Sequence, residues 1–289
     1  MPELPEVEVI RAGLEPAVTG ATVASVVVYD ERSLRRHPGP SEDFIDRLTG
    51  RRMLAPERRG KFMWIPLDGG AEVLVLHLGM SGQVLLRDRD TDDLRTRIRL
   101  ELAHPAHGPL RLNFVDQRIF GSMAIDTLVP TSDQPLQLVP ASVAHIARDP
   151  LDERFDDATF LARLSRKNTT IKRALLDQTL ISGVGNIYAD ESLWAAEIHY
   201  DQPTATLGRT RANALLAEVR TVLTKALAEG GTSFDAQYLN VNGQSGYFAH
   251  SLNAYGQQGE PCPRCGRPIV REQFMNRGSH FCPRCQRVR

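Results

Sequence analysis

Cys262-Pro-Arg-Cys265 is followed, after sixteen residues, by a second tetrapeptide of the same form, Cys282-Pro-Arg-Cys285. Two Cys-x2-Cys pairs at this separation are typical of a zinc ribbon, in which each pair of thiolates comes from one tight turn. Four thiolates fill a tetrahedral shell and leave no position open for a substrate, so we expect one structural Zn²⁺. These are the only four cysteines, and all lie in the last 28 residues, which argues against a disulfide framework.

The charge of the chain is balanced overall but unevenly distributed. The 35 Lys and Arg residues are matched by 35 Asp and Glu residues, which alone gives no reason to expect a polyanionic partner. From Pro261 onward, however, seven arginines stand against one acid, Glu272. Further basic clusters occupy residues 51–52, 58–61 and 163–173. Such patches are typical of nucleic-acid binding, although each one alone also fits an ordinary solvated surface.

The first half of the chain has the pattern of antiparallel β-structure preceded by one helix. Apolar residues at helical spacing cover residues 5–14. Six stretches then have the composition of strands: residues 22–29, 52–66, 72–78, 83–86, 98–102 and 110–114. Their irregular spacing and the turns at residues 68–70 and 107–109 favour an antiparallel sandwich over alternating βαβ units.

The second half has helical periodicity. Residues 129–150 carry four prolines among polar residues, which is typical of a connector. Apolar residues then recur at 3.6-residue spacing from about 155 to 230. The chain is therefore expected to be an α+β protein of about two domains, with the zinc ribbon at its end.

Within this helical half, a glycine-rich turn at residues 181–186 joins two predicted helices, 170–178 and 187–196. A helix N-terminus offers free N–H groups and a positive dipole end, so Gly185-Asn186 is suited to hold a phosphate. Lys167 and Lys172 nearby favour that interpretation. An ordinary helical hairpin with glycine at its C-cap remains the alternative.

Pro2 and Glu3 form a candidate catalytic pair at the N-terminus. If Met1 is removed, the secondary amine of Pro2 becomes the chain terminus, with a carboxylate beside it. An α-amino group titrates near pH ~8, so part of it is unprotonated and nucleophilic at neutral pH, as Schiff-base chemistry requires. Alternatively, Pro2 and Pro5 only shape the entry to a helix.

Seven motifs together resemble the formamidopyrimidine-DNA glycosylase family, the bacterial base-excision repair enzymes that remove 8-oxoguanine and ring-opened purines. They extend over essentially the whole chain: Met1-Pro-Glu-Leu-Pro-Glu-Val-Glu8, Arg58-Arg-Gly-Lys61, His77-Leu-Gly-Met-Ser-Gly82, Asp116-Gln-Arg-Ile-Phe-Gly121, Gly183-Val-Gly-Asn-Ile-Tyr188, Gly243-Gln-Ser-Gly-Tyr-Phe248 and the zinc ribbon. The resemblance implies four regions: a catalytic β-sandwich domain with an N-terminal helix (1–130), an interdomain linker (131–150), a helical DNA-binding domain with a helix-two-turn-helix and a lesion-capping loop (151–260), and a zinc finger (261–289).

The resemblance also implies the catalytic residues. Pro2 would attack C1′ of the damaged nucleoside, displace the base and form an iminium, with Glu3 as the acid–base residue. Two eliminations, β and then δ, would follow. The family pattern assigns Lys61 as an acid in base removal and β-elimination, and Arg277 to the second elimination. Lys61 alone also fits a solvated surface lysine, and phosphate binding is the physically simpler role for an arginine.

An enzyme that acts on a base inside a duplex must evert that nucleotide and fill the hole. The family pattern implies Met80, Arg118 and Phe120 for this insertion, and His77, Lys167 and Asn186 for other DNA contacts. Met80 and Phe120 also fit core residues, and His77 also fits a buried histidine in an apolar strand. Residues matching the pocket and the loop over the everted base are Glu6, Gln244, Ser245, Gly246 and Tyr247.

Two positions depart from the family pattern. Relatives often carry a His-x-His motif where this chain has residues 93–98, so one DNA-contacting histidine is absent, and Arg95 or Arg97 could replace it. Ile119 occupies a position where relatives often have arginine, which we expect to affect packing more than chemistry.

Two other functions remain open from the sequence. An endonuclease VIII-like enzyme for oxidised pyrimidines would share Pro2, Glu3 and zinc, but typically has glycine where this chain has Leu4. A non-catalytic zinc-containing DNA-binding protein would keep the turn and the ribbon alone.

No apolar run approaches the ~20 residues of a membrane helix, and no signal-peptide pattern is present. We therefore expect a cytoplasmic monomer that binds damaged double-stranded DNA and needs neither a membrane nor a small-molecule cofactor.

Overall fold

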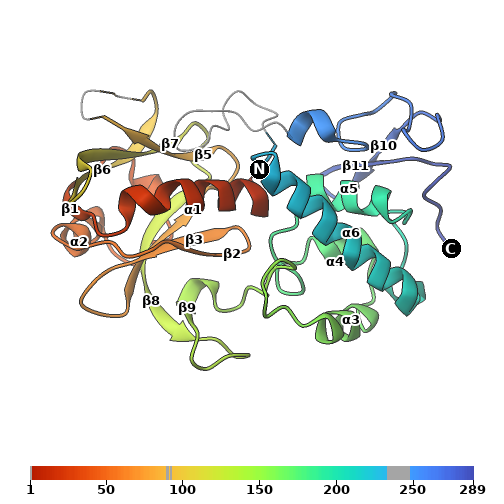
Figure 1. Ribbon diagram of the computed structural model, residues 1–289, viewed down its shortest axis with the longest axis horizontal. Helices are drawn as coiled ribbons and strands as arrows, with labels where there is room; N and C mark the ends of the chain where they lie inside the picture. The colour runs from red at the N-terminus through yellow and green to blue at the C-terminus, as the bar shows by residue number, and fades with distance from the viewer. Residues whose placement is uncertain (1, 89–90, 92, 233–247) are drawn as a thin grey trace. The chain divides into compact units, whose positions relative to one another are not determined.

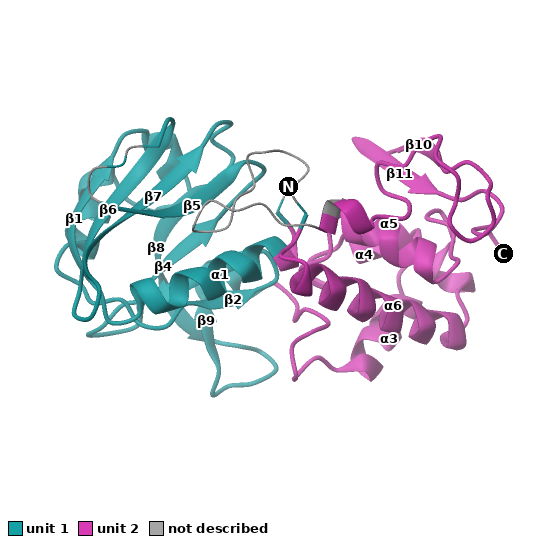
Figure 2. Cartoon of the chain, turned by 45° about the horizontal axis from the view of Figure 1, so that its top comes forward, with its two compact units in different colours: residues 1–2, 6–145, 232–246 teal, residues 3–5, 146–231, 247–289 magenta. Residues whose placement is uncertain are grey.

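The computed structural model describes residues 2–88, 91, 93–232 and 248–289, and these form two compact units (Figure 2). The sheet unit contains Pro2, Glu6–His145 and Thr232. The helical unit contains Glu3–Pro5, Ile146–Gly231 and residues 248–289. Each unit has its own hydrophobic core.

Two antiparallel sheets make up the sheet unit (Figure 1). One sheet has the order β1-β6-β7-β5, and the other has the order β2-β3-β4-β8-β9. The strands are β1 (Thr22–Val28), β2 (Glu57–Arg59), β3 (Phe62–Pro66), β4 (Glu72–His77), β5 (Gly82–Arg87), β6 (Thr96–His104), β7 (Gly108–Asp116), β8 (Ser122–Pro130) and β9 (Leu138–Pro140). Helix α1 (Leu4–Val18) from Glu6 onward, helix α2 (Ser41–Leu48) and the short 3₁₀ turns η1 (Glu31–Leu34) and η2 (Ala141–Val143) complete it.

Alternation of side chains explains why these strands form a sandwich. In β6, Ile98, Leu100 and Leu102 are buried, while Arg99 and Glu101 between them face away from the core. Leu100 and Phe114 of one sheet join Met63 and Leu76 of the other in a single apolar cluster, which α1 also contacts. The expected β-sandwich with a flanking helix is confirmed.

In the helical unit, helices surround a second core and a hairpin follows them. Its elements are α3 (Asp157–Ser165), α4 (Ile171–Leu175), α5 (Asn186–Ala195), η3 (Thr204–Thr206), α6 (Arg209–Ala228), η4 (Phe248–Ser251), β10 (Val270–Phe274) and β11 (Arg277–Phe281). Strands β10 and β11 pair in an antiparallel hairpin between the two cysteine pairs. The α+β class, with a helical second half and a Cys₄ hairpin, is confirmed.

Several element boundaries differ from the sequence-based expectation. The strand expected over residues 52–66 is two strands, because the chain reverses at Gly60, where φ is 57°. The helix expected over 170–178 ends at Leu175. Gln178 lies beyond this end of the helix. Its side-chain amide donates to the Val184 carbonyl and accepts a hydrogen bond from the Gly183 N–H. Helix α2 and strand β8, which lies between β4 and β9, were not expected.

In the described part of the chain, no helix combines the length and the apolar composition that crossing a membrane requires.

Candidate active site

The carboxylate of Glu3 is held at the N-terminus of helix α5. Its Oε2 accepts hydrogen bonds from the backbone N–H groups of Gly185, at 2.6 Å, and Tyr188, at 3.3 Å, and its Oε1 accepts one from Ile187, at 2.9 Å. Glu3 is 2 % exposed. The first turn of α5 therefore receives its anion from within the chain, and the helix dipole favours the negative charge at this end.

Two glycines make room for this arrangement. A Cβ at Gly185 would overlap the Glu3 carboxylate, and one at Gly183 would lie 2.7 Å from the Leu4 side chain. Gly183 also has a φ of 86°, and its carbonyl accepts the Leu4 N–H at 3.0 Å. We expected the N–H groups at this turn to bind a phosphate. That expectation is wrong for the N–H groups of Gly185, Ile187 and Tyr188, because they already donate to the Glu3 carboxylate.

Pro2 and Glu6 lie on either side of this residue in sequence and belong to the sheet unit. Pro2 is buried. Glu6 is 7 % exposed, and its carboxylate accepts hydrogen bonds from the Thr232 N–H, at 2.7 Å, and from the Thr232 hydroxyl, at 2.9 Å. Four of the residues expected at the lesion pocket lie outside the described residues: Gln244, Ser245, Gly246 and Tyr247.

A buried ion pair lies beneath the hairpin that carries Arg277. Lys172 on α4 and Asp190 on α5 are both fully buried, and their charged groups are 2.6 Å apart. The Lys172 ammonium also donates to the Gly278 carbonyl, at 3.1 Å, and to the Ser279 hydroxyl, at 2.7 Å. Burial lowers the pKa of Lys172, and Asp190 opposes that shift. Lys172 is thus an interior residue and is not available to a phosphate.

Arg277 itself is exposed at the start of β11. It lines a polar cavity of about 420 Å³ together with Arg271, Gln273 and Asn276. The Asn186 side-chain amide donates to the carbonyl of Gly278, the residue that follows Arg277, at 3.1 Å. Asn186 and Arg277 are therefore brought to the same part of the helical unit.

Lys167, the other basic residue expected to contact DNA in this unit, is partly buried. Its ammonium lies 2.5 Å from the Asp177 carboxylate. A phosphate that bound Lys167 would compete with this ion pair.

Lys61 and His77 come together in the sheet unit. Lys61 lies in the tight turn between β2 and β3, and His77 ends β4, where it pairs with Phe62 across the sheet. The His77 and Phe62 rings are 4.7 Å apart. Burial, and after it the positive charges of Arg36, Arg35 and Lys61, lower the pKa of His77 to about 4. His77 is therefore neutral near pH 7.

Met80, Arg118 and Phe120 lie on two adjacent loops of the sheet unit. Residues 78–81 connect β4 to β5, and residues 117–121 connect β7 to β8, so each loop passes from one sheet to the other. A Cβ at Gly79 would overlap the Phe120 backbone, which shows how closely the loops approach. Met80 is 42 % exposed and Phe120 is 48 % exposed, so neither is a core residue. We call residues 117–121 the wedge loop.

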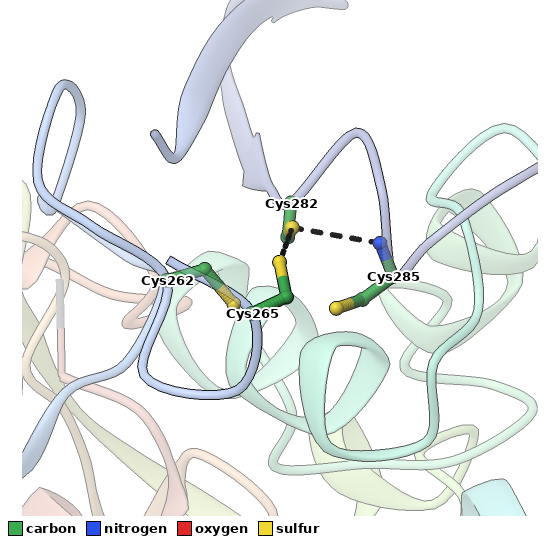
Figure 3. Close-up of side chains that lie close together, drawn as sticks. All are labelled: Cys262, Cys265, Cys282 and Cys285. Carbon is green, nitrogen blue, oxygen red and sulfur yellow. Dashed lines mark hydrogen bonds between the residues drawn. The ribbon is translucent and has the colours of Figure 1, made fainter. Parts of the chain in front are cut away.

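The four cysteine Sγ atoms of the zinc ribbon lie within 4.8 Å of one another (Figure 3). The Sγ atoms of Cys265 and Cys282 are 3.4 Å apart, and the Trp194 indole N–H lies 3.4 Å from the Cys262 Sγ. A cluster of four thiols around one point fits a tetrahedral Zn²⁺ with thiolate ligands. Cys262, Cys265, Cys282 and Cys285 are thus placed to hold one structural zinc.

Comparison with known proteins places three family domains on the chain. Residues 1–123 match the formamidopyrimidine-DNA glycosylase N-terminal domain, residues 146–237 match the formamidopyrimidine-DNA glycosylase H2TH domain, and residues 259–288 match the zinc finger found in FPG and IleRS. A protein of Leifsonia xyli subsp. xyli named formamidopyrimidine-DNA glycosylase is 64 % identical, and the match covers 100 % of both chains. The chain belongs to the formamidopyrimidine-DNA glycosylase family.

Solved structures of formamidopyrimidine-DNA glycosylases have the same fold. A Lactococcus lactis FPG mutant bound to DNA that contains Fapy-dG is 31 % identical, with a TM-score of 0.84, and the match covers 99 % of both chains. The Lactococcus lactis Fpg bound to DNA with an abasic site is 30 % identical, with a TM-score of 0.83 and coverage of 99 % of both chains. The family expected from the sequence motifs is confirmed.

Sequence reasoning missed two buried carboxylates of α5 that hold neighbouring segments of the helical unit. The Glu191 carboxylate, 2 % exposed, accepts the N–H groups of Ala254 and Tyr255, each at 2.8 Å, and of Asn253, at 3.0 Å. The adjacent Asp190 accepts the His280 N–H at 2.9 Å. The sequence offered one signal, two consecutive acids inside a helix that is mostly apolar, but it did not identify their partners.

Proposed function

We propose that this chain is a bifunctional base-excision repair enzyme. It removes oxidised purines, 8-oxoguanine and formamidopyrimidines, from double-stranded DNA and then cleaves the abasic strand. The position of Glu3 carries the proposal, because a buried carboxylate fixed by three N–H groups lies next in sequence to Pro2. Membership of the family supports the same activity, as do the DNA complexes of the related structures.

The first chemical step belongs to Pro2. With Met1 removed, its unprotonated amine attacks C1′ of the damaged nucleotide, and the C1′–N bond to the base breaks with its electron pair going to the base, which takes up a proton. The bond from C1′ to the ring oxygen then breaks, the oxygen keeps the electron pair and takes up a proton, and an iminium remains between Pro2 and the sugar. Glu3 is fixed beside Pro2 in the sequence, and its carboxylate can accept the proton that the amine loses.

The iminium makes the C2′ hydrogens acidic, and two eliminations follow. Loss of a C2′ proton breaks the C3′–O bond, and a second elimination breaks the C5′–O bond, which leaves a phosphate on each side of a one-nucleotide gap. Lys61 is proposed as an acid in base removal and in the first elimination. Arg277, in its polar cavity, is proposed to bind a phosphate during the second elimination.

The remaining site residues are proposed to bind the duplex. Met80, Arg118 and Phe120 fill the space left by the everted nucleotide, and the exposure of Met80 and Phe120 supports that role. His77, Lys167 and Asn186 are proposed to contact the DNA backbone. Glu6 and the segment with Gln244, Ser245, Gly246 and Tyr247 are proposed to close over the everted base. Zn²⁺ held by the four cysteines is proposed to stabilise the hairpin. We also expect the protein to be a monomer that acts on the chromosome in the bacterial cytoplasm.

Borohydride trapping tests this proposal. The full chain, with Met1 removal confirmed by mass spectrometry, is incubated with a duplex that contains 8-oxoguanine opposite cytosine, and the cross-linked peptide is mapped. We expect a cross-link at Pro2 and its loss in the Glu3→Gln variant, with an undamaged duplex as control. Trapping only on an oxidised pyrimidine would instead assign an endonuclease VIII-like activity. Failure on both substrates would indicate a non-catalytic DNA-binding protein.

A further inference from the structure

Arg35 binds the backbone of the wedge loop from outside it. Its Nη1 donates to the carbonyl of Ile119, at 2.9 Å, and to that of Gly121, at 2.8 Å. Its Nη2 donates to the carbonyl of Phe120. One guanidinium therefore binds three consecutive carbonyls, 84 to 86 positions away in sequence.

The loop that Arg35 binds contains a strained residue. Ile119 has a φ of 57°, in the left-handed region. A β-branched side chain rarely adopts this conformation, because its Cβ substituents crowd the backbone. Such a conformation persists only where the surrounding contacts determine it. The three hydrogen bonds from Arg35 are contacts of this kind, because they hold the carbonyls of Ile119 and of the two residues that follow.

A second group fixes the opposite side of the same loop. Asp116 is fully buried, and its carboxylate accepts the N–H groups of Arg118, at 3.1 Å, and Gly121, at 2.6 Å. It also accepts the Ser81 hydroxyl at 2.5 Å, which ties the wedge loop to the neighbouring loop of Met80. Asp116 thus holds N–H groups of the loop and Arg35 holds its carbonyls.

We propose that Arg35 is a positioning residue for DNA insertion: it stabilises the strained wedge loop in the conformation that presents Phe120 and Arg118. The proposal rests on the proposed function of this loop. Phe120 can enter the duplex quickly only if its backbone is already in place, since ordering the loop during insertion would add an entropic penalty. Arg35 acts on the backbone and is not itself a group that replaces the everted nucleotide.

The proposal predicts an energetic coupling between Arg35 and Ile119. Glycine adopts a positive φ without the steric penalty of isoleucine. If Arg35 stabilises the strained conformation, replacing Ile119 by glycine removes much of the need for it. Arg35→Ala should therefore be harmful in the native background and much less harmful in the Ile119→Gly background, and such non-additivity measures the interaction between the two positions.

The experiment measures insertion directly by stopped-flow fluorescence. The full-length enzyme is mixed with a duplex that carries 8-oxoguanine and the fluorescent base 2-aminopurine at the adjacent position, which reports unstacking. We expect Arg35→Ala to slow the insertion phase about tenfold, in line with the loss of hydrogen bonds from a charged donor at a partly exposed site. Arg32→Ala is the matched control, because Arg32 lies on the same turn, is 73 % exposed and pairs with Asp30.

Two further measurements separate positioning from other roles. Borohydride trapping on a single-stranded abasic oligonucleotide should be unchanged in Arg35→Ala, since no base pair has to be opened there. Affinity for an undamaged duplex should fall no more than in Arg32→Ala. The double variant Arg35→Ala/Ile119→Gly should recover most of the insertion rate.

Three outcomes would overturn the inference. Equal insertion rates in Arg35→Ala and the native enzyme would show that the bonds to the loop do not matter for insertion. A uniform loss of affinity for all duplexes would make Arg35 a phosphate contact. If the effects of Arg35→Ala and Ile119→Gly on the insertion rate were additive, the two positions would not be coupled. If the native enzyme itself gave no lesion-dependent fluorescence change, the proposed function of the wedge loop would fail instead.

Discussion

The helical unit and the sheet unit hold their candidate site residues in opposite ways. In the helical unit, the backbone holds a functional side chain, because three N–H groups of α5 bind the Glu3 carboxylate. In the sheet unit, side chains hold a functional backbone, because Asp116 and Arg35 bind the N–H groups and carbonyls of the wedge loop. Glu3, the proposed proton carrier, is thus fixed in the interior, whereas Phe120 remains 48 % exposed.

This difference predicts where substitutions reduce stability. In the helical unit, Glu3, Lys172 and Asp190 are buried, so replacing one member of such an interaction leaves a buried charge without its partner. In the sheet unit, Phe120 is an exposed side chain on a loop whose backbone is held by hydrogen bonds. Replacing such a side chain should change DNA insertion more than the free energy of unfolding. Three predictions test this contrast, in order of their expected effect on the free energy of unfolding.

Replacing Lys172 by methionine should have the largest effect. The substitution keeps a long unbranched side chain but removes the ammonium, and leaves Asp190 as a buried carboxylate without that partner. We expect a loss of about 3–5 kcal/mol in the free energy of unfolding, measured by urea denaturation. Arg173→Met is the matched control, since Arg173 is the next residue on α4 and is exposed. A loss in Lys172→Met no greater than in this control would contradict the importance of the ion pair.

A change of pH should affect stability through His77. Its folded pKa is about 4, against an ordinary value of 6.5. Between these two values the unfolded chain takes up a proton at His77 and the folded protein does not, so stability is fully present above pH 6.5 and falls as the pH approaches 4. The contribution is at most about 3 kcal/mol, by the usual conversion of a pKa shift.

The variant His77→Gln isolates this contribution from those of the other titratable groups. The difference in stability between the native protein and His77→Gln should change between pH 6.5 and 4, and should be constant above pH 7. A difference independent of pH across that window would show that His77 titrates normally in the folded state.

Local sequence patterns predicted the residues whose spacing is itself the signal. The cysteine pairs, the strands of the first half and the glycine-rich turn all have a periodic or spacing rule behind them. Strand β8 was not predicted, because residues 122–130 directly follow a loop motif and run into the proline-containing stretch 129–150. Helix α2 was not predicted either, although acids cluster in its first turn.

Long-range partners could not be predicted from local patterns. Glu3 and the N–H groups that it accepts are 182 to 185 positions apart, and nothing near either end specifies the pairing. The same holds for Lys172, which the sequence placed among basic surface residues although it is fully buried. A lysine has the same local pattern in both environments, and only the fold brings Asp190 to it.

Replacing Gly185 by alanine should have the smallest effect on stability but a large one on activity. A Cβ at this position would overlap the Glu3 carboxylate, so the side chain must move away from the α5 N–H groups. We expect a loss of about 1–3 kcal/mol in the free energy of unfolding, as for other over-packed sites. Borohydride trapping should fall by about 10²-fold, since displacement of a reacting group by ~1 Å has effects of that size.

The matched control is Gly208→Ala, because Gly208 also caps a helix of this unit, at the start of α6, and a Cβ there would meet nothing within 4 Å. Normal trapping in Gly185→Ala would mean that the backbone of α5 does not need to hold Glu3 in place, and the contrast between the two units would lose its functional meaning.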